Sequence, residues 1–337
     1  YLGKTVQIIP HITDEIKRRI QILGQNNKYD FIITEIGGTV GDIEALPYIE
    51  AVRQLKWELE NSAIFIHLTL IPFLSAAGEL KTKPTQHSVK TLLEAGIQPD
   101  ILVCRTEYSL SKDLRKKIAQ FCNVDFNAVI ESIDASSIYE VPLLMAKEGL
   151  DKVVLNKLNL NLNKDIKLDK WKNFLYALNN PIKEIKIGLV GKYVELQDAY
   201  KSISEAIIHA GTKNSCRVLV NWIHAEEINE KNIEKKLATL SGIIVAPGFG
   251  DRGIEGKIHA IKYVRENNIP FLGICLGMQT AVIEYARNVL NLKDANSLEM
   301  NAKTPHPVIH LMETQKNIFN KGGTMRLGSY DCSIIKN

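Results

Sequence analysis

The sequence predicts an α/β protein that consists of two doubly wound domains. Short runs of β-branched and other apolar residues alternate along the chain with segments of helical periodicity. This alternation is typical of parallel sheets that helices cover on both faces. A stretch rich in Asn, Lys and Leu interrupts the alternation near the middle of the chain. The 337 residues are enough for one hydrophobic core on each side of this stretch.

The first half contains several runs that we expect to form strands and helices in turn. The predicted strands span residues 31–34, 63–71, 101–104 and 128–130. The predicted helices span residues 13–24, 44–61 and 112–121. Because the two kinds of element alternate, the sequence predicts a parallel sheet with helices packed on it.

The second half repeats this pattern after a linker at residues 156–183. Within the linker, residues 171–178 have the spacing of one amphipathic helix, and Pro181 precedes the next strand. The predicted strands then span residues 186–190, 217–223, 242–246 and 269–274. The predicted helices span residues 199–210, 257–267 and 278–287. We therefore expect domains at residues 1–155 and 184–337.

The composition is that of an ordinary globular protein, with 45% hydrophobic and 24% charged residues. A net charge of +4 is small for this length, so it does not indicate a nucleic-acid partner. The most apolar stretch, residues 63–77, is interrupted by His67 and Pro72 and is too short to cross a bilayer. We therefore expect neither a nucleic-acid nor a membrane partner.

The cysteines are odd in number, scattered and without a CxxC pair: Cys104, Cys122, Cys216, Cys275 and Cys332. This pattern disfavours both a disulfide framework and a zinc site, and it favours a reducing cytoplasm. The chain opens at Tyr1 without an initiator Met, so we expect it to be a fragment of a longer protein.

The strongest chemical signal is a cysteine between two glycines, in the stretch IPFLGICLGMQ at residues 269–279. An apolar strand runs through Gly273, Cys275 and Gly277 into a helical pattern, which is typical of a nucleophile elbow with cysteine in place of serine. The partial positive charge of the helix N-terminus favours a thiolate. We interpret Cys275 as a nucleophile rather than as a buried structural thiol.

A cysteine mechanism on a carboxamide also needs donors for the tetrahedral oxyanion and a proton-transfer base. The strand at residues 242–246 is followed by Pro247, Gly248, Phe249 and Gly250. Because Pro247 has no N–H, Gly248 is the predicted donor in this loop, together with the Leu276 N–H. No candidate base stands beside these residues in the sequence.

Glycines and carboxylates also follow a strand in the first half, in the stretch TEIGGTVGDIE at residues 34–44. Glu35 at the end of a strand, beside glycines that let backbone approach phosphates, suits a Mg²⁺-nucleotide site. A glycine-rich turn with solvated carboxylates is the alternative.

A basic segment follows at residues 81–88, with the sequence KTKPTQHS. Lys81 and Lys83, with hydroxyl and amide donors on a loop stiffened by Pro84, form a plausible triphosphate clamp. The alternative is a solvated basic turn.

These motifs resemble known families. GICLGMQ with PGFGDRG resembles the class I glutamine amidotransferases, and KYVELQDAYKS, NSLEM and GGTMRLG narrow this to the CTP synthase family. The resemblance implies that Cys275 forms a glutamyl thioester and releases ammonia. It also implies a set of residues that hold glutamine: Gly248, Leu276, Gly277, Met278, Gln279 and Glu299. The family usually has PGGFG here, and Pro247 replaces its first glycine but spares Gly248.

The family's His-Glu pair, which assists the cysteine, has no counterpart in this sequence. His306 and His310 follow Cys275, but neither stands in the His-x-Glu setting. We expect the pair to lie beyond Asn337.

The first half resembles the amidoligase domain of the same family, a P-loop-type domain, through EIGGTVGDIE, HLTLIPF, GELKTKPTQHSVK, GIQPDIL and KIAQFCNV. The resemblance implies that Glu35 binds Mg²⁺ and that His11 lies near the ammonia path, although a core histidine is the alternative. The implied contacts to UTP or inhibitory CTP are Asp42, Ile43, Glu44, Lys81, Thr82, Lys83, Pro84, Thr85, Gln86 and Lys117. The implied contacts to ATP are Ile133, Asp134 and Ala135.

Both domains are expected to be incomplete, because the family's phosphate loop and a second metal-binding aspartate would lie before Tyr1. The family makes CTP by phosphorylating UTP with ATP and displacing the phosphate with ammonia from L-glutamine. It is activated by GTP, inhibited by CTP and assembled as homotetramers that stack into filaments. The alternatives are another ATP-dependent amidotransferase of the cobyric-acid-synthase type, and a non-catalytic scaffold or pseudoenzyme.

Overall fold

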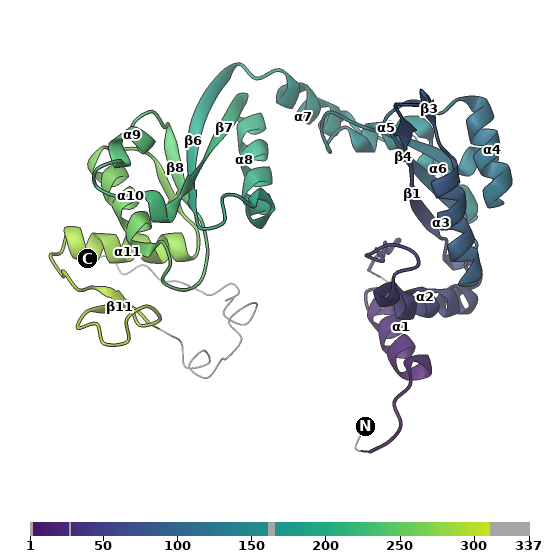
Figure 1. Ribbon diagram of the computed structural model, residues 1–337, viewed down its shortest axis with the longest axis horizontal. Helices are drawn as coiled ribbons and strands as arrows, with labels where there is room; N and C mark the ends of the chain where they lie inside the picture. Colours follow the sequence, from purple (N-terminus) through teal and green to yellow (C-terminus); the bar gives the residue numbers. More distant parts are fainter. Residues whose placement is uncertain (1–2, 27, 161–165, 311–337) are drawn as a thin grey trace. The chain divides into compact units, whose positions relative to one another are not determined.

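The computed structural model describes residues 3–26, 28–160 and 166–310 of the chain. The chain divides into two compact units, Tyr1–Asp169 and Lys170–Asn337 (Figure 1). Each unit is built on a parallel sheet, so the α/β prediction is confirmed. Within the described residues no helix is long and apolar enough to cross a membrane.

The sheet of the first unit has three parallel strands in the order β1-β4-β5. They are β1 (Ile66–Ile71), β4 (Ile101–Thr106) and β5 (Val129–Ile133). A hairpin of β2 (Phe73–Leu74) and β3 (Glu79–Leu80) follows β1 directly. Since all three sheet strands run the same way, the segments after β1, β4 and β5 leave the sheet at one edge.

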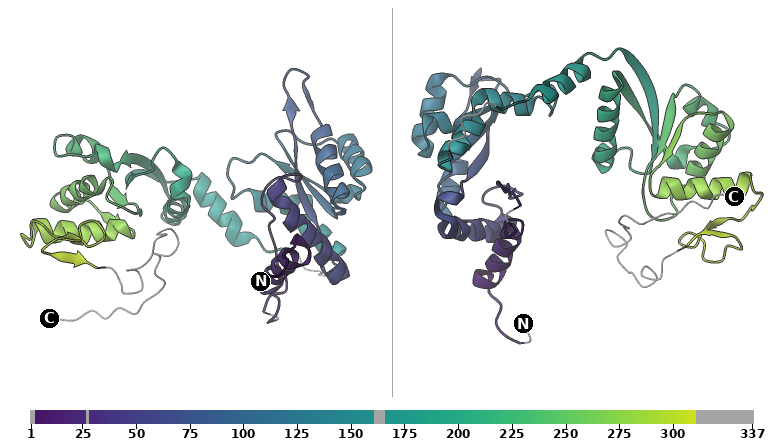
Figure 2. Two further views of the ribbon diagram at one scale, coloured as in Figure 1. Left: turned by 60° about the horizontal axis from the view of Figure 1, so that its bottom comes forward. Right: turned by 180° about the vertical axis from the view of Figure 1, so that it is seen from behind.

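Helices cover both faces of this sheet, as Figure 2 also shows. On one face, α3 (Lys83–Glu94) and α4 (Lys112–Cys122) form a core with the strands around Leu102 and Cys104. On the other, α5 (Val141–Glu148) and α6 (Leu150–Lys157) pack against Val103 and Ile130. The remaining helices of the unit are α1 (Thr13–Gln21) and α2 (Leu46–Leu59).

The strand that we predicted at residues 31–34 is wrong. These residues form no ladder with any described strand, and Ile33 is 94% exposed. A run of β-branched residues becomes a strand only when a neighbour pairs with its backbone. The edge strand β1 is not paired on its outer side by any described strand, and its Leu68 is 68% exposed.

The sheet of the second unit has four parallel strands in the order β7-β6-β8-β9. They are β6 (Lys183–Gly191), β7 (Cys216–His224), β8 (Gly242–Val245) and β9 (Phe271–Gly273). The central strands bury apolar side chains, Leu189 and Val190 on β6 and Ile243 and Val245 on β8, as expected when helices cover both faces. A short pair, β10 (Asn296–Ser297) and β11 (Pro307–Ile309), lies at the end of the described chain.

Helices flank both faces of this second sheet as well (Figure 1). One face carries α8 (Lys201–Lys213), whose Ile203 packs near Leu189 and Trp222. The other carries α9 (Ile233–Leu237) and α10 (Ile254–Glu266), which share the largest core with β6 and β8. The unit is completed by α7 (Asp169–Asn179) and α11 (Leu276–Asn288).

Short 3₁₀ and π turns connect these elements, at Ile8–Ile12, Ile43–Ala45, Glu60–Ser62, Phe126–Ala128, Gln197–Tyr200 and Ala225–Glu227. The four described cysteines, Cys104, Cys122, Cys216 and Cys275, are free thiols. Cys332 and the motif GGTMRLG lie outside the described residues.

Candidate functional site

Cys275 lies at a sharp turn between β9 and α11. Its backbone has φ 54° and ψ −108°, a conformation that costs energy for a residue with a side chain. It is exposed, whereas Cys104, Cys122 and Cys216 are buried. Burial raises the pKa of the Cys104 thiol to about 12 and that of Cys122 to about 11, so both are inert. Among the described cysteines, Cys275 alone has the setting of a nucleophile.

The glycines on either side make this turn possible because both pack directly against backbone. A Cβ on Gly273 would lie 2.6 Å from the carbonyl carbon and oxygen of Gly277. A Cβ on Gly277 would lie 2.1 Å from the backbone oxygen of Val245 on β8. Neither distance is open to a real side chain, so the strand and the helix approach this closely only with glycine at both positions. The predicted nucleophile elbow is present.

The helix after Cys275 presents unpaired backbone donors at its start. The Ile274 N–H donates to the Val245 carbonyl at 3.0 Å, and the Gln279 N–H donates to the Cys275 carbonyl at 3.0 Å. Leu276 is the first residue of α11, where a backbone N–H has no partner within the helix. Its N–H therefore suits a developing oxyanion next to the sulfur.

We expect Gly277→Ala to separate α11 from β8, because the added methyl group meets the Val245 carbonyl. Overpacking of this kind costs about 1–3 kcal/mol of stability and shifts the elbow. Thermal unfolding of the chain would measure the loss. Gly248→Ala is the matched control, because its Cβ would meet Leu276 and Lys192 at 3.6–3.7 Å, which is ordinary contact. Equal unfolding temperatures for the two variants would contradict the packing argument.

The loop after β8 lies against the elbow. The space above Gly248 is bounded by the Leu276 Cδ2 atom, 3.6 Å from an ideal Cβ, and by the side chain of Lys192. The structure thus brings the two predicted oxyanion donors, Gly248 and Leu276, next to each other. Within the described residues, the Gly248 N–H donates to no backbone carbonyl.

Two buried lysines border this loop, and the sequence patterns did not single them out. Lys192, 2% exposed, donates to the carbonyls of Phe249 at 2.7 Å and Gly250 at 2.9 Å. Lys257, 0% exposed, donates to the carbonyl of Ala246 at 2.8 Å. Their signal in the sequence is weak: Lys192 directly follows an apolar strand, and Lys257 falls on the apolar face of a helix.

Burial lowers the pKa of both lysine ammonium groups. Desolvation lowers the pKa of Lys192, the charge of Arg252 lowers it further, and the carboxylates of Asp251 and Glu299 oppose this. Desolvation lowers the pKa of Lys257 to about 8, with a further contribution from Lys192. The site therefore contains two buried lysines whose positive charges are disfavoured by desolvation and, at Lys257, by repulsion from Lys192.

The other residues predicted to hold glutamine lie around this loop and the start of α11. Met278 is exposed and Gln279 is half-buried in the first turn of the helix. Glu299 is half-buried, and its charge acts on Lys192. His306 and His310 are exposed beside β11, with no recorded contact to Cys275, so neither gains support as the base.

In the first unit, the structure brings two of the predicted nucleotide-binding lysines around one carboxylate. Lys81 bonds the Glu79 side chain, and this hydrogen bond lowers the pKa of the Glu79 carboxyl. The charge of Lys117, exposed on α4, lowers it further. An anion at this point thus interacts with both lysines.

The basic segment is not the loop that we expected. Lys83–Gln86 form the first turn of α3, with Pro84 near the helix start, where its missing N–H costs nothing. Thr85 is fully buried and its hydroxyl donates to the Leu70 carbonyl at 3.0 Å, so it is not a free donor. Thr82 is buried and accepts from the Gln86 side chain at 3.0 Å.

Residues 42–44 follow Gly41, which lies near the C-terminal end of α3. Asp42 accepts from the Thr39 N–H at 3.2 Å, and Ile43 and Glu44 are exposed. The neighbouring Gly41 lies near Thr91, which is eight residues, or about 12 Å of helix, beyond Lys83. The structure therefore does not bring the two predicted UTP segments to one point.

The predicted ATP segment follows β5 at the carboxyl edge of the sheet, where open α/β sheets bind ligands. Asp134 is exposed; its N–H donates to the Thr106 carbonyl at 3.0 Å and its carboxylate accepts from Arg105 at 3.3 Å. Ile133 and Ala135 flank it and are half-buried.

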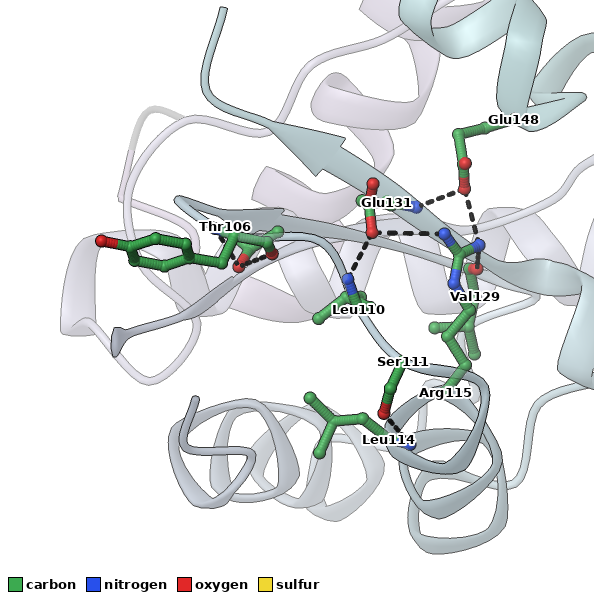
Figure 3. A network of polar contacts seen from close by, with 9 residues as sticks. Thr106, Leu110, Ser111, Leu114, Arg115, Val129, Glu131 and Glu148 are labelled. Carbon is green, nitrogen blue, oxygen red and sulfur yellow. Dashed lines mark hydrogen bonds and ion pairs between the residues drawn. The ribbon is translucent and has the colours of Figure 1, made fainter. Parts of the chain in front are cut away.

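A network of polar contacts fixes this end of β5, as Figure 3 shows. Glu131 accepts from the Leu110 N–H at 2.5 Å and from Arg115 at 3.3 Å. Arg115 also donates to Glu148 at 2.6 Å, and Glu148 accepts from the Glu131 N–H at 3.0 Å. The loop after β4, helix α4 and helix α5 are thereby tied to one strand, two residues before Ile133.

Glu35 and His11 lie on irregular parts of the first unit. Glu35 is exposed in the segment that forms no strand. No cluster of three His, Cys, Asp or Glu side chains that could hold a metal ion exists among the described residues. The His11 Nδ1 atom accepts from the Gln7 N–H at 2.9 Å.

Comparison with known proteins gives matches in both units. A family model described as CTP synthase N-terminus matches residues 1–160, and one described as glutamine amidotransferase class-I matches residues 195–337. A solved structure, the glutaminase domain of Trypanosoma brucei CTPS with bound acivicin, is 38% identical over 40% of this chain and 52% of that chain, with a TM-score of 0.38.

Curated relatives match over the whole chain. It is 67% identical to a CTP synthase of Flavobacterium johnsoniae, covering 100% of this chain and 63% of the relative. It is 66% identical to a CTP synthase of Christiangramia forsetii, covering 100% of this chain and 62% of the relative. The chain thus spans less than two thirds of the length of these relatives. On both domain matches and this identity, the chain belongs to the CTP synthase family.

Proposed function

We propose that this chain acts within a CTP synthase, which aminates UTP to CTP at the expense of ATP with ammonia taken from L-glutamine. The observation that carries the proposal is the exposed Cys275 on a glycine-flanked elbow, next to the Gly248 loop. In this proposal residues 1–155 belong to the synthetase domain, 156–183 to a linker and 184–337 to the glutaminase domain.

The glutaminase half-reaction starts with attack of the Cys275 thiolate on the carboxamide carbon of glutamine. A C–S bond forms, and the carbonyl oxygen becomes an oxyanion that the N–H groups of Gly248 and Leu276 would stabilise. The C–N bond then breaks, and the amide nitrogen leaves as ammonia after it accepts a proton. Water hydrolyses the thioester to glutamate. Met278, Gln279 and Glu299 would help to hold the substrate.

The synthetase half-reaction makes the C4 oxygen of UTP a leaving group. ATP transfers its γ-phosphoryl group to that oxygen, and ammonia displaces the phosphate to leave the 4-amino group of CTP. Ile133, Asp134 and Ala135 would contact ATP. Residues 81–86 and Lys117 would contact one part of UTP or inhibitory CTP, and residues 42–44, near the other end of α3, would contact another part.

Glu35 fits as an oxygen ligand of Mg²⁺ in this reaction. Magnesium usually binds proteins through one or two carboxylates and otherwise through phosphate oxygens and water. A single exposed carboxylate on a glycine-rich segment suits that pattern, and no larger carboxylate cluster is needed. The ion would neutralise charge on the transferred phosphoryl group. We further propose activation by GTP, a cytoplasmic location and a homotetramer that stacks into filaments.

The proposal is tested by incubating the complete protein with UTP, Mg²⁺-ATP and glutamine. We expect stoichiometric CTP, ADP, phosphate and glutamate. Glutamine hydrolysis with no reaction of UTP, but with amidation of a cobyric-acid-type carboxylate, would replace the proposal by that class of amidotransferase. The absence of both half-reactions would favour a scaffold.

We expect Lys81→Ala to weaken the binding of UTP and of CTP to a similar degree, because the triphosphates of both would contact the same ammonium group. Loss of one charge-assisted contact costs about 1.5–3 kcal/mol, or roughly ten- to a hundredfold in affinity. Titration of the full-length variant would give the UTP KM and the CTP inhibition constant. Lys90→Ala, which removes an exposed lysine further along α3, is the control. An unchanged UTP KM would make Lys81 a solvated surface lysine with no part in binding the nucleotide.

A further inference from the structure

Lys257 has no place in the family mechanism proposed above, yet the fold buries it completely. It lies on α10 among Ile254, Ile258 and Ile261, and its exposed fraction is 0%. Its ammonium group donates to the carbonyl of Ala246 at 2.8 Å. An ammonium group has three donors, so one recorded acceptor leaves a buried cation poorly compensated.

The carbonyl that Lys257 binds belongs to the residue before the Pro247-Gly248 turn. Lys192 binds the carbonyls of Phe249 and Gly250, which follow the turn. Two ammonium groups thus anchor the chain on both sides of Gly248. Pro247 has no N–H, so the Gly248 N–H is the first donor that this loop offers.

The charges around Lys257 also single it out. From the end of β6, Lys192 acts on it with a like charge and lowers its pKa; from the elbow, Cys275 raises it. Lys192 is itself faced by Arg252, Asp251, Glu299 and Glu226. Lys257 therefore lies within electrostatic range of the elbow as well as of the loop that it binds.

We propose that Lys257 is a positioning residue of the glutaminase site, where its ammonium group fixes the Ala246 carbonyl and hence the Gly248 donor beside Cys275. The inference rests on the proposed glutaminase function and adds a residue that acts on the nucleophile from behind the loop. A purely structural role fits less well, because an apolar side chain of similar length would fill the same space without a buried charge.

The test uses Lys257→Met, which keeps the length of the side chain, and Lys257→Gln, which keeps a neutral N–H donor. Alkylation of Cys275 in residues 1–337 by iodoacetamide is followed by mass spectrometry of its peptide over a range of pH. We expect Lys257→Met to slow alkylation at pH 7.5 by about tenfold, because a positive charge near the sulfur is removed. Lys262→Met, on the same helix and without a recorded partner, should leave the rate unchanged.

The stability of the variants separates positioning from packing. We expect the unfolding temperature of Lys257→Met to stay within about 4 °C of wild type, since a poorly compensated charge is removed. Should the Met variant fail to fold, Lys257→Gln serves instead and should slow alkylation to a similar degree. A lowered unfolding temperature with an unchanged alkylation rate in both variants would overturn the proposal.

Glutamine hydrolysis by the complete protein distinguishes this inference from the proposed function. Lys257→Met should lower the kcat of hydrolysis by about 10²-fold, as expected when an oxyanion donor is misplaced. If wild type hydrolyses glutamine and Lys257→Met does so equally well, the inference fails alone. If wild type hydrolyses none, the proposed function fails, while the alkylation result still tests the effect of Lys257 on Cys275.

Discussion

Replacing Cys275 by alanine in the complete protein is expected to abolish CTP formation from glutamine and to spare CTP formation from ammonium. In the proposed reaction the thiolate serves only to liberate ammonia, so its loss would remove a covalent step for which no other proposed group substitutes. Glutaminase activity should fall by about 10³-fold or more. Cys275 belongs to the second compact unit and the proposed synthetase residues to the first, so the ammonium-dependent rate should stay within about twofold of wild type.

Cys216→Ala provides the control for this variant. Cys216 is buried at the start of β7 and its thiol donates to the Asn214 carbonyl at 3.3 Å, so its loss touches no part of the elbow. Both nitrogen sources should support CTP formation in this variant. Loss of the glutamine-dependent and ammonium-dependent reactions to the same degree in Cys275→Ala would contradict the assignment of Cys275 as the glutaminase nucleophile.

Glu35→Ala is expected to have the opposite effect. Without the proposed Mg²⁺ ligand, phosphorylation of UTP should slow by about 10²-fold or more, because an ion at the phosphates contributes several kcal/mol to that step. Glutamine hydrolysis, measured separately as glutamate release, should persist. The assay is ammonium-dependent CTP formation as a function of Mg²⁺ concentration.

Asp30→Ala is the matched control for Glu35→Ala, because Asp30 is an exposed carboxylate on the same irregular segment with no recorded partner. Its CTP formation should equal that of wild type at every Mg²⁺ concentration. If Glu35→Ala also equals wild type, Glu35 is a solvated carboxylate, and the metal ligand must be sought elsewhere.

The turn at Cys275 could be predicted from the sequence because it requires glycines at fixed positions, and these can be read directly from the sequence. A Cβ at position 277 would lie 2.1 Å from the Val245 backbone oxygen, so only glycine fits where the helix meets the strand. Glycines flank Cys275 on both sides. The proposed oxyanion donor rests on a similar local constraint, since Pro247 has no N–H and leaves Gly248 as the first donor of the loop. Local constraints of this kind do not depend on the rest of the fold.

Other features depend on tertiary contacts that no local pattern reports. Residues 31–34 have the composition of a strand, but no described strand pairs with them. The Pro84 segment was predicted as a loop, although proline is equally at home in the first turn of a helix, where the structure has it. The burial of Lys192 and Lys257 could not be foreseen, because lysine is almost always exposed.

The most direct test of the account follows nitrogen from glutamine to CTP. The complete protein is supplied with UTP, Mg²⁺-ATP and glutamine labelled with nitrogen-15 at the amide, with unlabelled ammonium present in the buffer. The account predicts CTP that carries the label at its 4-amino group with wild type, and only unlabelled CTP with Cys275→Ala. Labelled CTP from Cys275→Ala, or no CTP from wild type with either nitrogen source, would contradict it.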